Sequence, residues 1–343
     1  LTQGWRCHSC AAGWSKIMIE ITEHITLDPA EISETFIHAG GPGNGQAAKM
    51  CNNMILGVSM IAVAEAARNL VCVGAQPTAI TNNLNFGNPL KAHIYYQFRE
   101  AVLGMKEACE AFETPVTGGN VSFYNETDGV AIYPTPVIGM VGVIDDASKI
   151  VGQAFQTEGD DIVLLGENTD ELGGSEYLYV TARLVAGAPP SLDLGKERAL
   201  QQAVLMMTHG RHLRSARDCS DGGLACTLAE CALGDGEAPI GISVELDDDL
   251  PPVAVLFAES QGRIVISCAA DQTVHVLRIA KEHGVPAAKI GSVTTGGSPF
   301  RIVMPEGKME ADLVEIAEGQ GKTPAQVVLR WLVQLGVIVI PQA

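Results

Sequence analysis

Two segments rich in asparagine and glycine carry the side chains best suited to bind a ligand. They are Thr81–Pro89 (TNNLNFGNP) and Gly118–Ser122 (GGNVS), and each follows a predicted strand. Amide and hydroxyl oxygens can bind a hard cation, and glycine lets backbone N–H groups approach a phosphate closely. Asparagine and glycine are also the commonest turn formers, so a purely structural role stays open for each segment. Together the two segments suit a nucleotide or another phosphorylated ligand with Mg²⁺.

Two glycine pairs stand at predicted helix starts, in Asp170–Leu178 (DELGGSEYL) and in Asp218–Glu230 (DCSDGGLACTLAE). Free N–H groups at a helix start can hold an anion. The alternative is ordinary N-capping, by Ser175 in the first segment and by Asp221 in the second. Asp221 could also be a carboxylate of a site. A third polar group, Glu259–Gln261, precedes a strand and either faces a cleft or marks a turn.

Several better-known motifs are incomplete. Gly319–Thr323 (GQGKT) resembles a P-loop, but Ile316 stands where that motif requires its first glycine. Cys7–Cys10 is a CxxC pair without a second pair at zinc-site spacing. The sequence also contains no HExxH and no GxSxG motif. The motifs therefore point neither to a P-loop enzyme nor to a zinc protease or serine hydrolase.

The elements that would position these segments alternate between helices and strands. Helices are expected at Met60–Ala75, Tyr95–Phe112, Arg198–Gly210 and Val274–Gly284. Strands are expected before both asparagine-rich segments and at Lys16–Leu27, Pro134–Ile144, Gly159–Gly166, Gly241–Asp247, Gly262–Cys268 and Phe300–Met304. His38–Gln46 is expected to be a flexible run, and a helix–strand pair is expected after Gly307. This alternation is typical of an α+β or α/β protein.

The length of 343 residues predicts two domains with short additions. Changes in composition along the chain place the boundaries. We expect an atypical N-terminal segment at residues 1–52, a first domain at 53–145, a second domain at 146–305 and a tail at 306–343.

The net charge of −18 indicates which partners the chain can have. Such an acidic chain repels the backbone of nucleic acids and anionic lipids, so neither a nucleic acid nor a membrane is expected as a partner. The longest nearly apolar stretch, Met54–Ala64, is too short to span a bilayer. The nine cysteines lack the spacing of a disulfide framework, which predicts reduced thiols and a cytoplasmic location.

Six sequence strings, taken together, resemble one enzyme family. They are AVAEAARNLVCVGAQPTAITNNLNFGNP, TPVTGGNVSFYNET, YPTPVIGMVGVI, LGGSE, CSDGGLACTLAECA and FAESQGR. From about Asn53 to about Met304 the chain resembles the second half of the synthetase region of phosphoribosylformylglycinamidine synthase. The resemblance implies the fold of the aminoimidazole ribonucleotide synthetase superfamily. In that fold an N-terminal α+β domain pairs into a shared β-barrel, and a C-terminal α/β domain follows.

The resemblance also implies an activity and its site residues. The family comprises ATP-dependent ligases of purine biosynthesis, which convert formylglycinamide ribonucleotide and glutamine-derived ammonia into an amidine. By resemblance, Asn82 and Gly119 contact ATP, Asn120 binds Mg²⁺ and Ser122 contacts the substrate. The implied partners are formylglycinamide ribonucleotide, a glutaminase subunit, and either a second copy of this chain or a separate chain that supplies the missing first half.

The sequence departs from the family in three places. The first half of the synthetase region, with its catalytic histidine and SHNH-type motif, has no counterpart here, so no catalytic residue is assigned and the chain is expected to be incomplete alone. Gly43–Gln46 (GNGQ) faintly resembles the GGQ segment of a peptide-release factor, and Gly321–Ala343 resembles one helix–strand unit of an aldo-keto reductase. The alternatives are a non-catalytic module that binds nucleotide or dimerises, and another ATP-dependent kinase or synthetase of the same superfamily.

Overall fold

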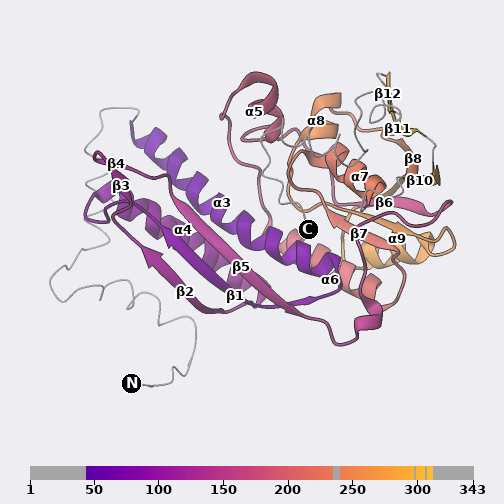
Figure 1. Cartoon of the computed structure of the whole chain (residues 1–343), viewed down its shortest axis with the longest axis horizontal. Coiled ribbons are helices and arrows are strands. Elements are labelled where there is room, and N and C mark those ends of the chain that lie inside the picture. The colour runs from indigo at the N-terminus through magenta and orange to yellow at the C-terminus, as the bar shows by residue number, and fades with distance from the viewer. Residues whose placement is uncertain (1–43, 235–239, 297–298, 306, 312–343) are drawn as a thin grey trace, which may run out of the picture.

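A computed structural model of the chain describes residues 44–234, 240–296, 299–305 and 307–311 (Figure 1). The described residues form two main units, each built on one β-sheet. The expected strand at Lys16–Leu27, the CxxC pair and the P-loop-like segment lie outside the described residues. The predicted domain boundaries stay a prediction.

The first unit is a three-stranded sheet covered on one face by two helices (Figure 1). Its elements are α3 (Asn44–Cys72), β1 (Gln76–Asn85), α4 (Ala92–Phe112), β2 (Val116–Ser122) and β5 (Thr135–Val143). The central strand β1 runs parallel to β2 and antiparallel to β5. The short strands β3 (Glu126–Thr127) and β4 (Val130–Ala131) form a hairpin between β2 and β5.

Close packing between α3 and α4 depends on a glycine. A Cβ atom at Gly104 would lie 2.2 Å from the carbonyl oxygen of Leu56, which is shorter than any real contact. Glycine therefore lets the two helix backbones approach closely. Helix α4 ends where Glu113 adopts φ 59°, and the Glu113 N–H donates to the Cys109 carbonyl. This left-handed residue turns the chain into β2.

Helix α3 contains a window, Ile55–Cys72, that is long and apolar enough to cross a membrane by length and composition. The expectation from Met54–Ala64, that this region is too short to span a bilayer, is therefore wrong on length, because the helix continues past Glu65. Val63, Ala64, Ala67 and Val71 nevertheless have no exposed surface and lie in the protein core. Burial of this kind is typical of a core helix in a folded domain.

The second unit is a seven-stranded sheet with helices on both faces. The strand order is β12-β11-β8-β10-β6-β9-β7. The strands are β6 (Asp161–Leu165), β7 (Ser215–Asp218), β8 (Ile240–Glu245), β9 (Ile264–Cys268), β10 (Ala287–Gly296), β11 (Phe300–Met304) and β12 (Gly307–Ala311). The helices are α5 (Glu176–Ala182), α6 (Leu194–His209), α7 (Gly223–Leu233), α8 (Pro252–Phe257) and α9 (Thr273–Glu282), with a 3-10 turn at Ala147–Lys149 before β6.

Two cores hold this three-layer unit together. Helices α6 and α9 pack on one face, where Leu200 and Ile279 contact the sheet through Val163 and its neighbours. Helices α7 and α8 pack on the other face, around Leu228. The end of α3 joins the first of these cores through Val71, so α3 belongs to the interior of both units.

The predicted α+β class and most of the predicted elements are confirmed. Four expectations are wrong. The asparagines of Thr81–Asn85 and the whole of Gly118–Ser122 lie inside β1 and β2, because strand pairing overrides the turn preference of asparagine and glycine. Asn44–Gln46 lie in α3 instead of a flexible run, and Met309–Ala311 lie in β12 instead of a helix. The remainder of the predicted C-terminal pair lies outside the described residues.

Candidate functional site

The four predicted binding residues lie on the adjacent strands β1 and β2. Asn82 is opposite Gly119, Asn83 is opposite Asn120, and Asn85 is opposite Ser122. Successive side chains of a strand point to opposite faces of the sheet. Asn82, whose Nδ2 lies 4.0 Å from the Met105 sulfur on α4, therefore faces the helices, whereas Asn120 faces the open side. Strand pairing therefore brings these residues close together, but it places Asn82 and Asn120 on opposite faces of the sheet.

Gly119 is required for the close contact between β1 and β2. A Cβ atom at this position would lie 2.1 Å from Oδ1 of Asn82 and 2.4 Å from its carbonyl oxygen. In the described part of the chain, β2 pairs only with β1, so its other side is an open sheet edge. Gly119 and Asn120 lie on this edge strand, whereas Asn82 lies on the neighbouring central strand.

Asn125 belongs to this site, although the sequence pattern did not single it out. Its Nδ2 donates to the carbonyl oxygens of Phe86, at 3.0 Å, and Ser122, at 2.9 Å, and lies 3.1 Å from the Ser122 hydroxyl. Asn125 therefore joins the ends of β1 and β2 and orients the predicted substrate contact Ser122. The string SFYNET contains the residue, but its spacing gave no sign of this role.

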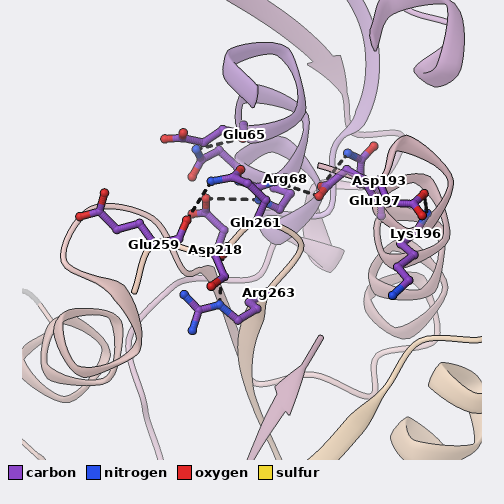
Figure 2. Close-up of polar contacts among 12 residues, drawn as sticks. Glu65, Arg68, Asp193, Lys196, Glu197, Asp218, Glu259, Gln261 and Arg263 are labelled. Atoms are coloured by element: carbon purple, nitrogen blue, oxygen red, sulfur yellow. Dashed lines mark hydrogen bonds and ion pairs between the residues drawn. The ribbon is translucent and has the colours of Figure 1, made fainter. Parts of the chain in front are cut away.

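A second polar cluster lies where the two units meet. We call it the carboxylate junction, and its labelled members in Figure 2 include Glu65, Arg68, Glu197, Asp218, Glu259 and Gln261. The guanidinium of Arg68 has no exposed surface. Its Nη1 lies 2.9 Å from Oε2 of Glu197 on α6, and its Nε lies 3.8 Å from Oδ2 of Asp218 on β7. The Arg68 Nε and the Asp218 Oδ2 are both buried without a hydrogen-bond partner among the described residues.

Burial governs the protonation of the junction carboxylates. It raises the pKa of Glu65 to about 7, Arg68 opposes this rise, and neighbouring carboxylates add to it. Burial also raises the pKa values of Asp218 and Glu259, although Asp218 is close to Arg68. One arginine therefore does not compensate for the desolvation of several carboxylates. The junction favours protons or other cations over anions.

A carboxylate of the chain already binds N–H groups at the two glycine turns, by which we mean Gly173–Glu176 and Asp221–Gly223. Oε1 of Glu259 accepts from the Gly222 N–H at 2.9 Å and from the Glu176 N–H at 3.0 Å. These N–H groups are consequently not free to hold an anion, and the acidic surroundings disfavour one further. Ser175 is the N-cap of α5, as capping predicts. The expected cap by Asp221 is wrong, because Gly222, with φ 76°, is the N-cap of α7 and has no side-chain cap bond.

No group of three or more histidine, cysteine, aspartate or glutamate side chains is arranged to hold a metal ion within the described ranges. A magnesium site would thus need amide or phosphate oxygens in addition to carboxylates. Asn120, which is exposed, supplies such an oxygen. Its assignment to Mg²⁺ stays a prediction.

Comparison with known families places the chain in a class of proteins. The family model for AIR synthase related protein, N-terminal domain, matches residues 52–144, and the model for the C-terminal domain matches residues 157–304. The chain therefore belongs to the AIR synthase related family.

Within this family the chain is similar to the phosphoribosylformylglycinamidine synthase subunit PurL. It is 54% identical to PurL of Moorella thermoacetica over 231 residues, which are 67% of this chain and 31% of the relative. It is 44% identical to PurL of Chlorobium chlorochromatii over 284 residues, which are 78% of this chain and 37% of the relative. The chain thus spans about a third of the length of these curated relatives.

Solved structures share the fold. Thermotoga maritima PurL complexed with ATP gives a TM-score of 0.60 at 19% identity, over 80% of this chain and 43% of that one. T. maritima PurL complexed with FGAR gives 0.60 at 19% identity, over 81% and 42%. A chain of a HypE–HypF complex gives 0.55 at 20% identity, over 74% of this chain and 84% of that one.

Proposed function

We propose that this chain supplies the second synthetase unit of a PurL-type phosphoribosylformylglycinamidine synthase, a ligase of purine biosynthesis in the cytoplasm. One observation carries the proposal: both domains of the family occur in order in a chain that is 44–54% identical to proteins named PurL. The reaction converts the amide of formylglycinamide ribonucleotide into an amidine. ATP phosphorylates the amide oxygen, and ammonia then displaces the phosphate.

In this proposal the nucleotide lies along the open edge of β2. Asn82 and Gly119 contact ATP, Asn120 binds Mg²⁺, and Ser122, oriented by Asn125, contacts the substrate. Bound Mg²⁺ would neutralise charge on the transferred phosphoryl group. The open edge and the exposed glycine backbone of β2 support this placement. The related T. maritima PurL structures complexed with ATP, AMPPCP and ADP support a nucleotide as the ligand.

The proposed enzyme needs partners. A first synthetase unit comes from a second copy of this chain or from a separate chain, and a glutaminase subunit supplies ammonia. The related structure of PurLQS from Thermotoga maritima supports an assembly with further subunits. The exposed face of the three-stranded sheet, opposite α3 and α4, is the surface that we expect to pair with the sister unit.

A second candidate function is a self-standing unit that binds nucleotide without making the amidine. The observation in its favour is that the chain covers 84% of a chain in a HypE–HypF complex, so a single pair of these domains is nearly a whole protein there. Binding of formylglycinamide ribonucleotide separates the two candidates, because only the PurL-type unit has a reason to recognise it.

Nucleotide binding tests the proposal directly. A ligand that binds only the folded state raises the melting temperature, so Mg²⁺ and ATP together should stabilise the chain more than ATP alone. Asn120→Ala should remove most of this Mg²⁺-dependent difference, as measured by differential scanning fluorimetry and isothermal titration calorimetry. Asn69→Ala, on the exposed side of α3, is the matched control and should leave it unchanged. Absence of any effect of millimolar Mg²⁺ and ATP on the wild-type chain would refute the nucleotide site.

A further inference from the structure

The segment Ala258–Arg263 (AESQGR) links the first unit to the two glycine turns of the second. We propose that Gln261 is a positioning residue, which transmits the position of α3 to the starts of α5 and α7. The proposal rests on the nucleotide-binding function above in one respect: the proposed nucleotide site lies in the first unit, and Gln261 connects that unit to the second.

The first step is the contact between Arg68 and Gln261. Nη2 of Arg68 donates to Oε1 of Gln261 at 2.6 Å, across 193 residues of sequence. Nη1 of the same guanidinium is held by Glu197 at 2.9 Å. A charged group without exposed surface cannot replace these partners with water. When α3 moves, Arg68 must therefore carry Gln261 with it or leave the buried Nη2 donor without this acceptor (Figure 2).

The second step leads from Gln261 to the glycine turns. Nε2 of Gln261 donates to the carbonyl oxygen of Glu259 at 3.1 Å, so both ends of the amide group are in use. The Glu259 carboxylate in turn accepts from the N–H groups of Gly222 and Glu176. A displacement of Gln261 thus reaches the first residues of two helices through one side chain.

The rest of the segment is fixed to the second unit. Arg263 donates to the carbonyl oxygens of Ala258, at 2.6 Å, and Ser260, at 3.1 Å. The Ser260 hydroxyl lies 2.5 Å from the hydroxyl of Thr169. These contacts fix the segment within the second unit, whereas Gln261 connects it to α3. Gln261 therefore provides the contact between this segment and Arg68 of the first unit.

Amide hydrogen exchange measures this role without requiring enzyme activity. Gln261→Met keeps the size of the side chain and removes both hydrogen bonds. We expect it to speed exchange of the Gly222 and Glu176 N–H groups by about tenfold, which is the effect of losing one net hydrogen bond. Exchange in β6 and β9 should stay at the wild-type rate. Gln201→Met is the matched control, because Gln201 is a second glutamine of the junction and donates at 3.1 Å to Glu197, on the same helix α6.

Two results would overturn the proposal. These are unchanged exchange at Gly222 and Glu176 in Gln261→Met, and equally fast exchange in Gln201→Met. If the methionine variant does not fold, Gln261→Ser, which is too short to reach Arg68, takes its place with the same expectations.

Titration with Mg²⁺ and ATP then relates the positioning role to the function. If the wild-type chain binds the nucleotide, Gln261→Met should weaken binding, because α3, which packs on the sheet of the proposed site, loses its contact with the second unit. Gln201→Met should not change the affinity. Unchanged affinity in Gln261→Met would overturn the link to the nucleotide. If the wild-type chain binds no nucleotide, the proposed function fails, whereas the exchange rates still decide whether Gln261 positions the glycine turns.

Discussion

Glu65 is a junction carboxylate whose protonation changes near neutral pH. Its pKa in the folded chain is about 7, above the ordinary value of 4.5, because the carboxyl group is buried among other acids. The folded state therefore binds this proton more tightly than the unfolded state does. The resulting stabilisation is complete below pH 4.5 and is lost as the pH rises through 7.

Glu65→Gln should remove this pH dependence. Between pH 5 and pH 8 the wild-type chain should lose about 2 kcal/mol of unfolding free energy through Glu65, a value reduced to allow for the partial exposure of the group. The variant should lose correspondingly less and should be the more stable of the two at pH 8. Urea unfolding at pH 5, 6, 7 and 8 measures the difference, with Glu107→Gln on the exposed side of α4 as the control. Parallel curves for Glu65→Gln and wild type would contradict the assignment.

At the scale of elements, the sequence predicted whether a segment is a helix or a strand better than it predicted which strands pair. The periodic helix Tyr95–Phe112 and the buried strand Gly262–Cys268 were predictable because one apolar pattern determines each. Strand β10 was missed because its burial does not alternate, and its neighbours β6 and β8 are distant in sequence. The division of Asn82 and Asn120 between two faces depends on the register of β1 and β2, which single-strand patterns do not determine.

The contact between α3 and α4 gives an element-scale prediction. Gly104→Ala places a Cβ atom 2.2 Å from one backbone oxygen and 3.0 Å from its carbon, and a helix backbone cannot move aside as a side chain can. We expect a loss of about 2–3 kcal/mol of unfolding free energy. Gly57→Ala on the facing helix is the control, since nothing lies within 4 Å of its Cβ position. That variant should be stabilised by about 0.5–1 kcal/mol. Equal melting temperatures for the two variants would disprove this packing.

At the scale of the molecule, the face of the three-stranded sheet opposite α3 and α4 exposes apolar side chains. Along β5 the outward side chains include Val137, Val141 and Val143, which are 50%, 63% and 53% exposed. Adjacent exposed valines on a sheet are typical of a surface that pairs with another protein. This feature supports the proposed pairing of two synthetase units.

We expect the isolated chain to form a homodimer through this face. Val141→Lys should weaken the dimer at least about tenfold, because a charge would be buried in the contact. Val274→Lys, on α9 in the second unit, replaces a valine that is 74% exposed and should leave the dimer intact. Sedimentation velocity at micromolar concentration distinguishes these outcomes. A well-folded wild-type monomer would contradict the pairing.

The long sequence separation of the Arg68 contacts also has a consequence for synthesis on the ribosome. Glu197 follows Arg68 by 129 residues and Gln261 follows it by 193. At about 5–20 residues per second, the partner at Gln261 emerges roughly 10–40 s after the arginine. Glu197 emerges earlier in that interval, and only at its end does the guanidinium have both partners, so α3 cannot complete its packing against the second unit before Gln261 has emerged. Final packing of α3 therefore depends on residues of the second unit that are synthesised later. A nascent chain stalled before Gln261 should be a substrate for chaperones.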